Sequence, residues 1–69
     1  MKLDTIGKNI RKFRLVKKLR QEDLAEKTDL TTNYIGMVER GERNPSYLSL
    51  IKIAKGLNMT VDELIKPNN

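Results

Sequence analysis

The segment from Thr31 to Met37 carries the side chains that are best suited to contact a partner molecule. It offers hydroxyl, amide and thioether groups, and no acidic residue interrupts it before Glu39. A short helical surface with hydrogen-bonding groups and no negative charge is unusual for an exposed helix. Such a surface suits insertion into a DNA groove, where hydroxyl and amide groups meet the edges of the bases. The segment is therefore the first candidate for a binding site.

Two short helical patterns hold this segment in place. Their apolar or small positions are Leu24, Ala25 and Thr28 in the first pattern, and Ile35 and Val38 in the second, which Gly41 closes. Helices this short share too little surface to pack side by side as a hairpin. A break of about four residues between them instead predicts a helix-turn-helix, in which two helices cross at a steep angle.

Helical patterns also flank this pair on both sides. The first is a stripe of apolar positions spaced three or four residues apart, namely Ile6, Ile10, Phe13 and Val16. We expect this helix to be capped by Asp4 or Thr5 and to end near residue 18. A second stripe follows Ser46, which can cap its helix, at the core positions Leu50, Ile53, Ala54 and Leu57.

The remaining helix ends are marked by residues that favour them. Thr31 can cap the second helix of the pair, which starts after the turn and runs to about Arg40. Thr60 is followed three residues later by Glu63, which forms a capping box. This box predicts a last short helix over Val61–Lys66.

Composition limits both the fold and the function. Sixty-nine residues suit one compact domain, and no segment alternates as a strand does, so we expect a single all-α domain of five helices over residues 1–69. The chain has no cysteine or histidine, which excludes disulfides, thiolate–zinc sites and the commonest catalytic base. We therefore expect no catalytic residue, cofactor, metal or enzyme activity. The absence of a long apolar run predicts a cytoplasmic protein without a membrane span.

Positive charge is concentrated in one part of the chain. Residues 1–20 hold eight basic side chains against Asp4 alone, whereas residues 21–69 hold six basic and eight acidic ones. A net charge of +5 distributed in this way favours a polyanionic partner such as nucleic acid. The alternative, a solvated lysine-rich helix face, accounts for the charge equally well.

An ordered set of residues along the chain resembles a known family. The set comprises Gln21, Leu24-Ala25, Ile35, Glu39-Arg40-Gly41, Pro45-Ser46, Ile53-Ala54, Leu57 and Asp62-Glu63-Leu64. It is similar to the phage-repressor/Cro-type helix-turn-helix family, also called lambda-repressor-like or XRE, over about residues 5–66. The resemblance implies a compact five-helix DNA-binding domain. Helices 2 and 3 would form the helix-turn-helix, and helix 3 would be the recognition helix that enters the DNA.

The resemblance implies roles for individual residues of the third helix. The base-contacting positions of the family correspond to Thr32, Asn33 and Met37, with Thr31 and Gly36 beside them. The chemistry agrees, because the Asn33 amide can bind N6 and N7 of adenine and Met37 can meet a thymine methyl group. The competing interpretations are plain solvation of Asn33 and packing of Met37 against the second helix.

Other positions of the family contact the DNA backbone or hold the fold. The implied phosphate contacts are Gln21, Arg43, Asn44, Ser46 and Tyr47, and Arg20 is placed to reach a phosphate as well. Arg14 and Glu39 match a partly buried ion pair of the family, which implies a structural role. The alternatives for Gln21 and Arg43 are an ordinary first-turn residue and a free loop arginine.

Three residues depart from the habits of the family. Arg20 replaces the usual serine or threonine cap of the second helix, and Asp29 stands in the turn where the family prefers glycine. Gly36 is expected to leave a bare place on the third helix, which permits close approach to DNA. It costs helix stability, about 0.5–1 kcal/mol relative to alanine. We expect the turn to form with Asp29 in a left-handed conformation.

These features together predict a sequence-specific regulator of transcription that binds double-stranded DNA. One recognition helix contacts only a few base pairs, so we expect a homodimeric repressor that binds a palindromic operator through the major groove. Surplus apolar residues that could form its dimer interface are Leu48, Ile51, Val61, Leu64 and Ile65. The alternative is an antitoxin or another interaction protein that binds DNA but acts mainly through a protein partner. A protein co-regulator is compatible with both functions.

Overall fold

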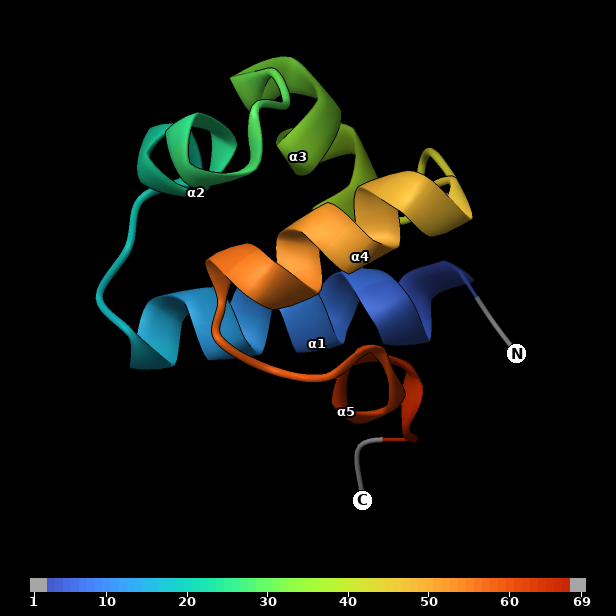
Figure 1. The fold of residues 1–69 in the computed structure, drawn as a ribbon. Helices are drawn as coiled ribbons and strands as arrows, with labels where there is room; N and C mark the ends of the chain where they lie inside the picture. Colours follow the sequence, from blue (N-terminus) through green and yellow to red (C-terminus); the bar gives the residue numbers. More distant parts are fainter. Residues whose placement is uncertain (1–2, 68–69) are drawn as a thin grey trace.

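The computed structural model describes residues 3–67, which form five helices joined by short connections (Figure 1). The helices are α1 (Leu3–Val16), α2 (Gln21–Thr28), α3 (Thr32–Glu39), α4 (Tyr47–Gly56) and α5 (Val61–Ile65). This part of the chain contains no strand, and the predicted all-α fold class is confirmed. None of the helices within residues 3–67 is both long enough and apolar enough to cross a membrane.

Three helices begin at the side-chain caps that the sequence predicts. Each cap hydroxyl accepts a hydrogen bond from the backbone N–H three residues later, in the pairs Thr31–Tyr34 (3.0 Å), Ser46–Ser49 (3.1 Å) and Thr60–Glu63 (3.2 Å). At the start of α2 the hydrogen bond runs in the opposite direction. The backbone N–H of the cap residue Arg20 donates to the Asp23 carboxylate, three residues later, at 2.8 Å. These bonds satisfy N–H groups that have no partner within a helix, and so they define where each helix starts.

The turn between α2 and α3 closes around Asp29, as expected. This residue has φ 59° and ψ 32°, in the left-handed region. Aspartate tolerates this region better than most residues that carry a Cβ atom. Left-handed residues also follow α1 at Lys18, α3 at Gly41 and α4 at Asn58, with φ values of 59°, 75° and 57°. The α2–α3 turn therefore forms without the glycine that the family prefers.

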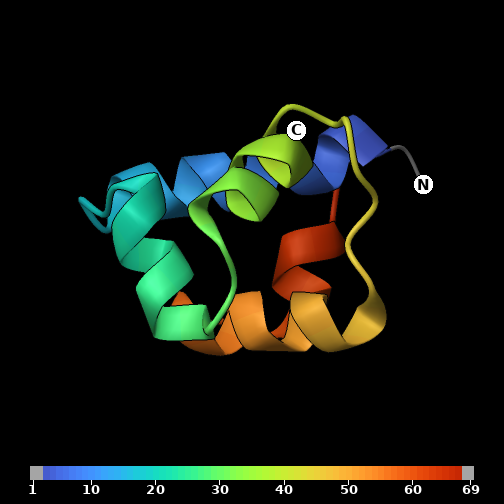
Figure 2. The ribbon, with the colours of Figure 1, turned by 90° about the horizontal axis from the view of Figure 1, so that it is seen from above.

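The helices enclose a core to which all of them contribute. Helix α1 packs against α3 and α5, α2 packs against α3 and α4, and α4 packs against α5. Figure 2 shows the arrangement from above, with α1 and α4 on opposite sides of the molecule. The largest fully buried side chains are Ile10, Leu24, Ile35, Val38, Ile53, Leu57 and Leu64. Burial of their apolar surface holds α3 against the rest of the fold.

The expected inner face and start of α1 are wrong at several residues. Val16 is 69% exposed, whereas Arg14 is buried at 6%. At about 100° per residue, Val16 lies roughly 120° around the helix from Ile10, and Arg14 lies only about 40° from it. The helix also begins earlier than expected, so Asp4 and Thr5 lie within it and cannot be its cap, and it ends at Val16. The inner face of α1 therefore ends in a buried guanidinium group.

Two further residues on α1 bring other helices close to it. A Cβ atom on Gly7 would lie 2.7 Å from the backbone oxygen of Glu39, an approach that only glycine permits. Asn9 is 2% exposed, and its Nδ2 donates to the backbone oxygens of Leu64 and Lys66, both at 2.7 Å. These bonds attach the end of α5 to α1. Neither contact is visible in the hydrophobic pattern of the sequence.

Candidate nucleic-acid interface

The N-terminal half of α3, which carries Thr32 and Asn33, lies at one edge of the molecule (Figure 1). Thr31, Thr32 and Asn33 are exposed, and Met37 is half-buried. Met37 follows Asn33 by one helical turn, and its sulfur accepts a weak hydrogen bond from the Asn33 amide at 3.7 Å. The opposite face of α3 is buried in the core. The structure thus brings these predicted base-contacting residues together on one accessible surface.

Gly36 does not form the bare place that was expected. The residue is buried, because side chains from α2 and from the end of α3 cover it. A Cβ atom on Gly36 would lie 3.0 Å from Nη1 of Arg40 and 3.6 Å from Oε1 of Gln21. The expectation failed because a hydrophobic pattern does not show which side chains fold back over a glycine. The backbone at Gly36 is therefore covered by the side chains of Arg40 and Gln21 and is not accessible to DNA.

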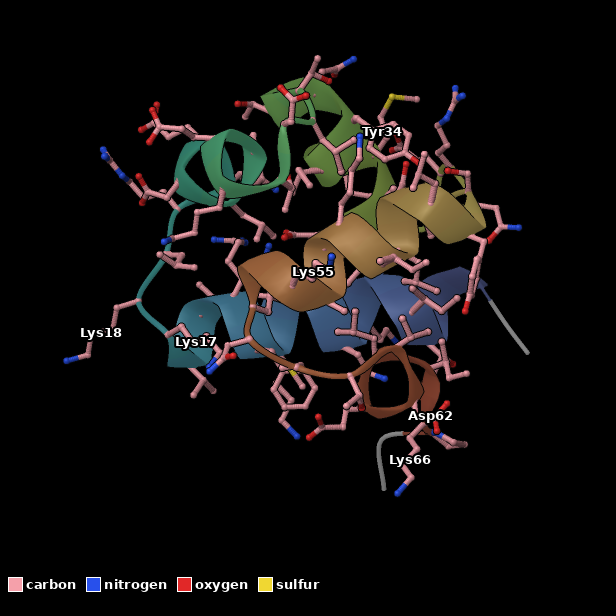
Figure 3. The ribbon with its side chains drawn as sticks, viewed as in Figure 1. Lys17, Lys18, Tyr34, Lys55, Asp62 and Lys66 are labelled. Carbon is pink, nitrogen blue, oxygen red and sulfur yellow. The ribbon has the colours of Figure 1, made fainter. Side chains whose placement is uncertain are left out.

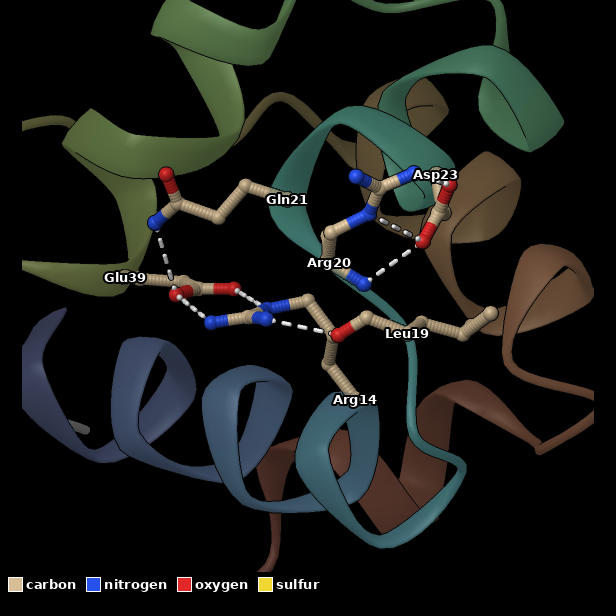
Figure 4. Close-up of polar contacts among 6 residues, drawn as sticks. All are labelled: Arg14, Leu19, Arg20, Gln21, Asp23 and Glu39. Atoms are coloured by element: carbon tan, nitrogen blue, oxygen red, sulfur yellow. Dashed lines mark hydrogen bonds and ion pairs between the residues drawn. The ribbon is translucent and has the colours of Figure 1, made fainter.

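A buried ion pair ties α3 to α1, and the predicted partners Arg14 and Glu39 form it (Figure 4). Nε of Arg14 donates to Oε2 of Glu39 at 2.7 Å, and Nη2 donates to Oε1 at 3.0 Å. Nη1 of Arg14 donates to the backbone oxygen of Leu19 at 2.8 Å. The side chains are only 7% and 1% exposed. This bidentate, charge-assisted geometry is expected for an ion pair that is retained in a dry interior.

Gln21 extends this network to the start of α2. Its Nε2 donates to Oε1 of Glu39 at 3.0 Å, and Figure 4 shows its oxygen pointing away from that carboxylate. The amide therefore braces α3 against α2. An amide nitrogen carries two hydrogens, so this bond leaves Nε2 with a further donor. The predicted contact between Gln21 and a phosphate stays a prediction.

Arg20, at the same end of α2, is engaged by acidic neighbours. Nη1 lies 2.9 Å from Oε1 of Glu22, and Nε lies 3.3 Å from Oδ2 of Asp23. The backbone N–H of Arg20, followed by its guanidinium, lowers the pKa of Asp23 below its ordinary value. Arg20 would have to exchange these carboxylates for a phosphate, and its contact with DNA stays a prediction.

Tyr34 connects α3 to the loop that follows it. It is half-buried against the core, and Figure 3 shows it between α3 and the start of α4. Its hydroxyl oxygen accepts the backbone N–H of Ser46 at 3.3 Å, and the Arg43 guanidinium lies 5.5 Å from its ring centre. The ring thereby places Arg43 near α3 by a cation–π contact.

The predicted phosphate-contacting residues that follow α3 differ in whether their polar groups can still bind an anion. Arg43, Asn44 and Tyr47 are exposed. The Ser46 hydroxyl accepts the N–H of Ser49 as the α4 cap, so this hydroxyl is already used within the protein. The N–H groups that open α4 remain suited to an anion, because the first turn of a helix lacks carbonyl partners.

Arg40 and Glu42 form a second bidentate arginine–glutamate pair, which was not predicted from the sequence. Nε of Arg40 donates to Oε2 of Glu42 at 2.9 Å, and Nη2 donates to Oε1 at 3.1 Å. Both side chains are 54% exposed. The hydrogen bond with Arg40 lowers the pKa of Glu42. An arginine followed two residues later by a glutamate at a helix end was the available signal.

The residues predicted for a dimer interface fall into three groups by burial. Leu48 is 62% exposed, while Ile51, Val61 and Ile65 are half-buried. Leu64 is fully buried, so its assignment to an intermolecular surface is wrong. It points inward because α5 has a single inward-facing position that the core fully covers, and Asn9 of α1 holds the backbone there.

Residues 10–64 match the helix-turn-helix family HTH_3, and this match takes in α2, α3, α4, the second half of α1 and most of α5. The chain belongs to this family. It is 44% identical over 62 residues to the control protein C.SmaI of Serratia marcescens, covering 90% of this chain and 74% of that protein. It is 36% identical over 61 residues to the immunity repressor of Bacillus phage phi105, covering 88% of this chain and 42% of that repressor.

A solved structure with the same fold is the restriction-modification controller protein C.AhdI from Aeromonas hydrophila. The TM-score is 0.88 at 40% sequence identity, and the match covers 90% of this chain and 94% of that one. The chain is a helix-turn-helix DNA-binding regulator of transcription and not an enzyme. The α2–α3 unit described above is its helix-turn-helix.

Proposed function

We propose that this regulator binds a palindromic operator as a homodimer and contacts the bases in the major groove through α3. The observation that carries the proposal is the exposed, uncharged start of α3, where Thr32 and Asn33 project with Met37 one turn below. The groove is wide enough to admit a helix, and hydroxyl and amide groups can contact base edges there. The core behind α3 fixes the helix, so these side chains approach DNA as a unit.

The groups around α3 suit contacts with the DNA backbone. Gln21 lies at one side of α3, while Arg43 lies in the loop at the other side, against the Tyr34 ring. Asn44 and the first turn of α4 follow Arg43. Contacts to phosphates on both sides of the recognition helix would set its register, and the residues of α3 would then select the sequence.

A homodimer is supported by the apolar surface on α4 and α5. Leu48 is 62% exposed, and Ile51 and Ile65 are half-buried on two helices that pack against each other. A second copy of the chain would cover this surface. Two-fold pairing would place the two α3 helices at half-sites separated by about 34–36 Å, one turn of DNA.

The biological role that we propose is the control of restriction–modification genes in the cytoplasm, by repression at the operator. C.SmaI is a control protein and C.AhdI is a restriction-modification controller, and both are similar to nearly the full length of this chain. Occupation of an operator blocks access of polymerase without any catalytic group. A co-regulator is not required for this mode of action.

Selection of bound duplexes from a random pool tests the proposal. The expected result is a pair of inverted half-sites with a fixed centre-to-centre distance. The same selection with Asn33→Ala should lose the preference at one position in each half-site, worth about 1–3 kcal/mol. If the selected pool shows no sequence preference, α3 does not recognise bases. The same conclusion follows if Asn33→Ala weakens binding to operator and random DNA equally.

The oligomeric state is tested by sedimentation of the variant Ile51→Glu/Ile65→Glu. Two buried carboxylates in an apolar interface should give monomers at concentrations where the unchanged protein is a dimer. Glu26→Lys, on the exposed side of α2, is a control for altered charge. If the double variant remains a dimer, the interface lies elsewhere on the molecule.

A further inference from the structure

The guanidinium of Arg40 lies over the middle of the recognition helix. Arg40 is the C-terminal cap residue of α3, and its Nη1 stands 3.0 Å from the position that a Cβ atom of Gly36 would take. Oε1 of Gln21 lies 3.6 Å from the same position. The side chain therefore folds back by one helical turn, into the space that the missing Cβ leaves. It ends beside Gln21, one turn after Thr32.

Glu42 holds this guanidinium through two parallel hydrogen bonds, at 2.9 and 3.1 Å. Both side chains are 54% exposed, so water and ions reach the pair. The two-point geometry of a carboxylate on a guanidinium is also the geometry of a phosphate on a guanidinium. An exposed ion pair of this kind contributes little to stability, so exchange of one anion for another needs little free energy.

We propose that Arg40 is a DNA-phosphate ligand of this regulator, seated on Gly36 beside Gln21, and that Glu42 occupies it until a DNA phosphate takes the place of the carboxylate. The inference rests on the proposed function, because it assumes that DNA approaches the exposed side of α3. Glu42 then acts as an internal competitor. It lowers the affinity for every duplex and leaves the choice of bases to Thr32 and Asn33.

The decisive variant is Arg40→Gln/Glu42→Gln, which removes both charges and keeps the net charge of +5. Loss of one phosphate contact from each protomer of the dimer should reduce the slope of log affinity against log salt by about 1.8. Between 0.05 and 0.2 M salt, the affinity of the unchanged dimer should therefore fall about 12-fold more than that of the variant. The effect should be the same on operator and random duplexes. A slope equal to that of the unchanged protein, or a loss confined to the operator, would overturn the proposal.

Glu42→Gln tests the competition directly. With the carboxylate gone, Arg40 is available to DNA, and binding should become tighter than in the unchanged protein. Asp62→Asn gives the same change of net charge on α5, which Figure 3 shows on the opposite side of the molecule from α3. If Asp62→Asn tightens binding as much as Glu42→Gln does, bulk charge explains the effect and Glu42 is no competitor.

Gly36→Ala tests whether the Arg40 guanidinium needs the space that the missing Cβ atom of Gly36 leaves. The new methyl group would meet the movable end of Arg40 and displace it, and binding should weaken although alanine favours a helix. In an Arg40→Gln background the same substitution should have no further effect, because there is no guanidinium to displace. An equal loss in both backgrounds would mean that the methyl group itself obstructs DNA, which contradicts the role of Gly36 as a seat.

Failure of this inference is distinguishable from failure of the proposed function. If the unchanged protein yields no preferred sequence in the selection experiment, the proposed function fails. If it selects inverted half-sites while Arg40→Gln/Glu42→Gln binds them with an unchanged salt slope, only the role of Arg40 and Glu42 is lost.

Discussion

Two arginine–glutamate pairs of nearly the same geometry lie at the end of α3. The pair of Arg14 and Glu39 has two hydrogen bonds, at 2.7 and 3.0 Å, and the pair of Arg40 and Glu42 has two, at 2.9 and 3.1 Å. Their exposure is what separates them. The side chains of the first pair are 7% and 1% exposed, whereas both side chains of the second are 54% exposed.

The difference shows that burial, rather than contact geometry, decides what such a pair can do. Removing one partner of a buried pair leaves an uncompensated charge in the interior, so Arg14 and Glu39 are fixed in place. The exposed pair is surrounded by water, and its partners can exchange at small cost. The inner pair, Arg14 and Glu39, therefore holds α3 on α1. The outer pair, Arg40 and Glu42, is free to respond to an approaching anion.

The largest expected effect is the loss of the inner pair in Glu39→Gln. The amide retains the shape of the side chain but leaves Arg14 charged and buried at 6% exposure. The free energy of unfolding should fall by about 3–5 kcal/mol. For a domain of this size the melting temperature should fall by about 12 °C or more, as measured by circular dichroism.

Glu42→Gln is the matched control for this experiment, because it makes the same chemical change in the outer pair. Its free energy of unfolding should stay close to that of the unchanged protein, because exposed ion pairs contribute little to stability. Similar losses in the two variants would contradict the distinction between the pairs.

Two glycines extend the comparison, one near each pair. Gly7 faces the backbone of α3, and a Cβ atom there would lie 2.7 Å from the oxygen of Glu39. Because backbone cannot move aside cheaply, Gly7→Ala should cost about 1–3 kcal/mol of stability. Gly36→Ala meets only the flexible ends of the Arg40 and Gln21 side chains and should raise stability by about 0.5–1 kcal/mol. Chemical denaturation of both variants measures this, and changes of the same sign would show that the two sites are equally rigid.

The parts of this fold that depend on local chemistry were predictable from the sequence. The caps at Thr31, Ser46 and Thr60 and the left-handed Asp29 follow from side chains that bond to their own backbone neighbours. The pair of Arg14 and Glu39 was predicted from family resemblance alone. Spacing carries no information on it, because its partners lie on helices that are distant in sequence.

The errors share a different physical origin. The apolar stripe of α1 does not extend to Val16, because two successive steps of three residues carry Val16 roughly 120° around the helix from Ile10. The cover over Gly36 and the outer pair depend on the path of the long Arg40 side chain, which folds back on its own helix. The two bonds of Asn9 to the end of α5 depend on tertiary packing. Sequence patterns register the surface that a helix buries but not the course of its flexible side chains.

Gln21 links the inner pair to the side of α3 that we propose to face DNA, and Gln21→Leu should separate bracing of α3 from contact with a phosphate. The hydrogen bond to Glu39 at 3.0 Å is lost, which should cost about 0.5–1.5 kcal/mol of stability. This is less than for Glu39→Gln, since both charges of the inner pair remain. The loss is measured by denaturation, and DNA binding is measured at a temperature where both proteins are folded. Unchanged DNA binding would confine Gln21 to bracing α3.

The smallest expected effect concerns the titration of the outer pair. The hydrogen bond from Arg40 lowers the pKa of Glu42 below its ordinary value. A carboxyl group with a depressed pKa in the folded state contributes stability above its unfolded pKa, and this contribution is lost as the pH falls through the folded pKa. In Arg40→Gln the pKa of Glu42, followed by the carboxyl carbon shift in NMR, should return toward its ordinary value.

Asp23 provides the internal control for this titration, since the backbone N–H of Arg20 is the main cause of its lowered pKa. That pKa should stay low in Arg40→Gln, and it should stay low even in Arg20→Gln, because the substitution leaves the backbone donor in place. A Glu42 pKa that stays low without Arg40 would place its cause elsewhere in the loop. The outer pair would then be too weak to hold the guanidinium over Gly36.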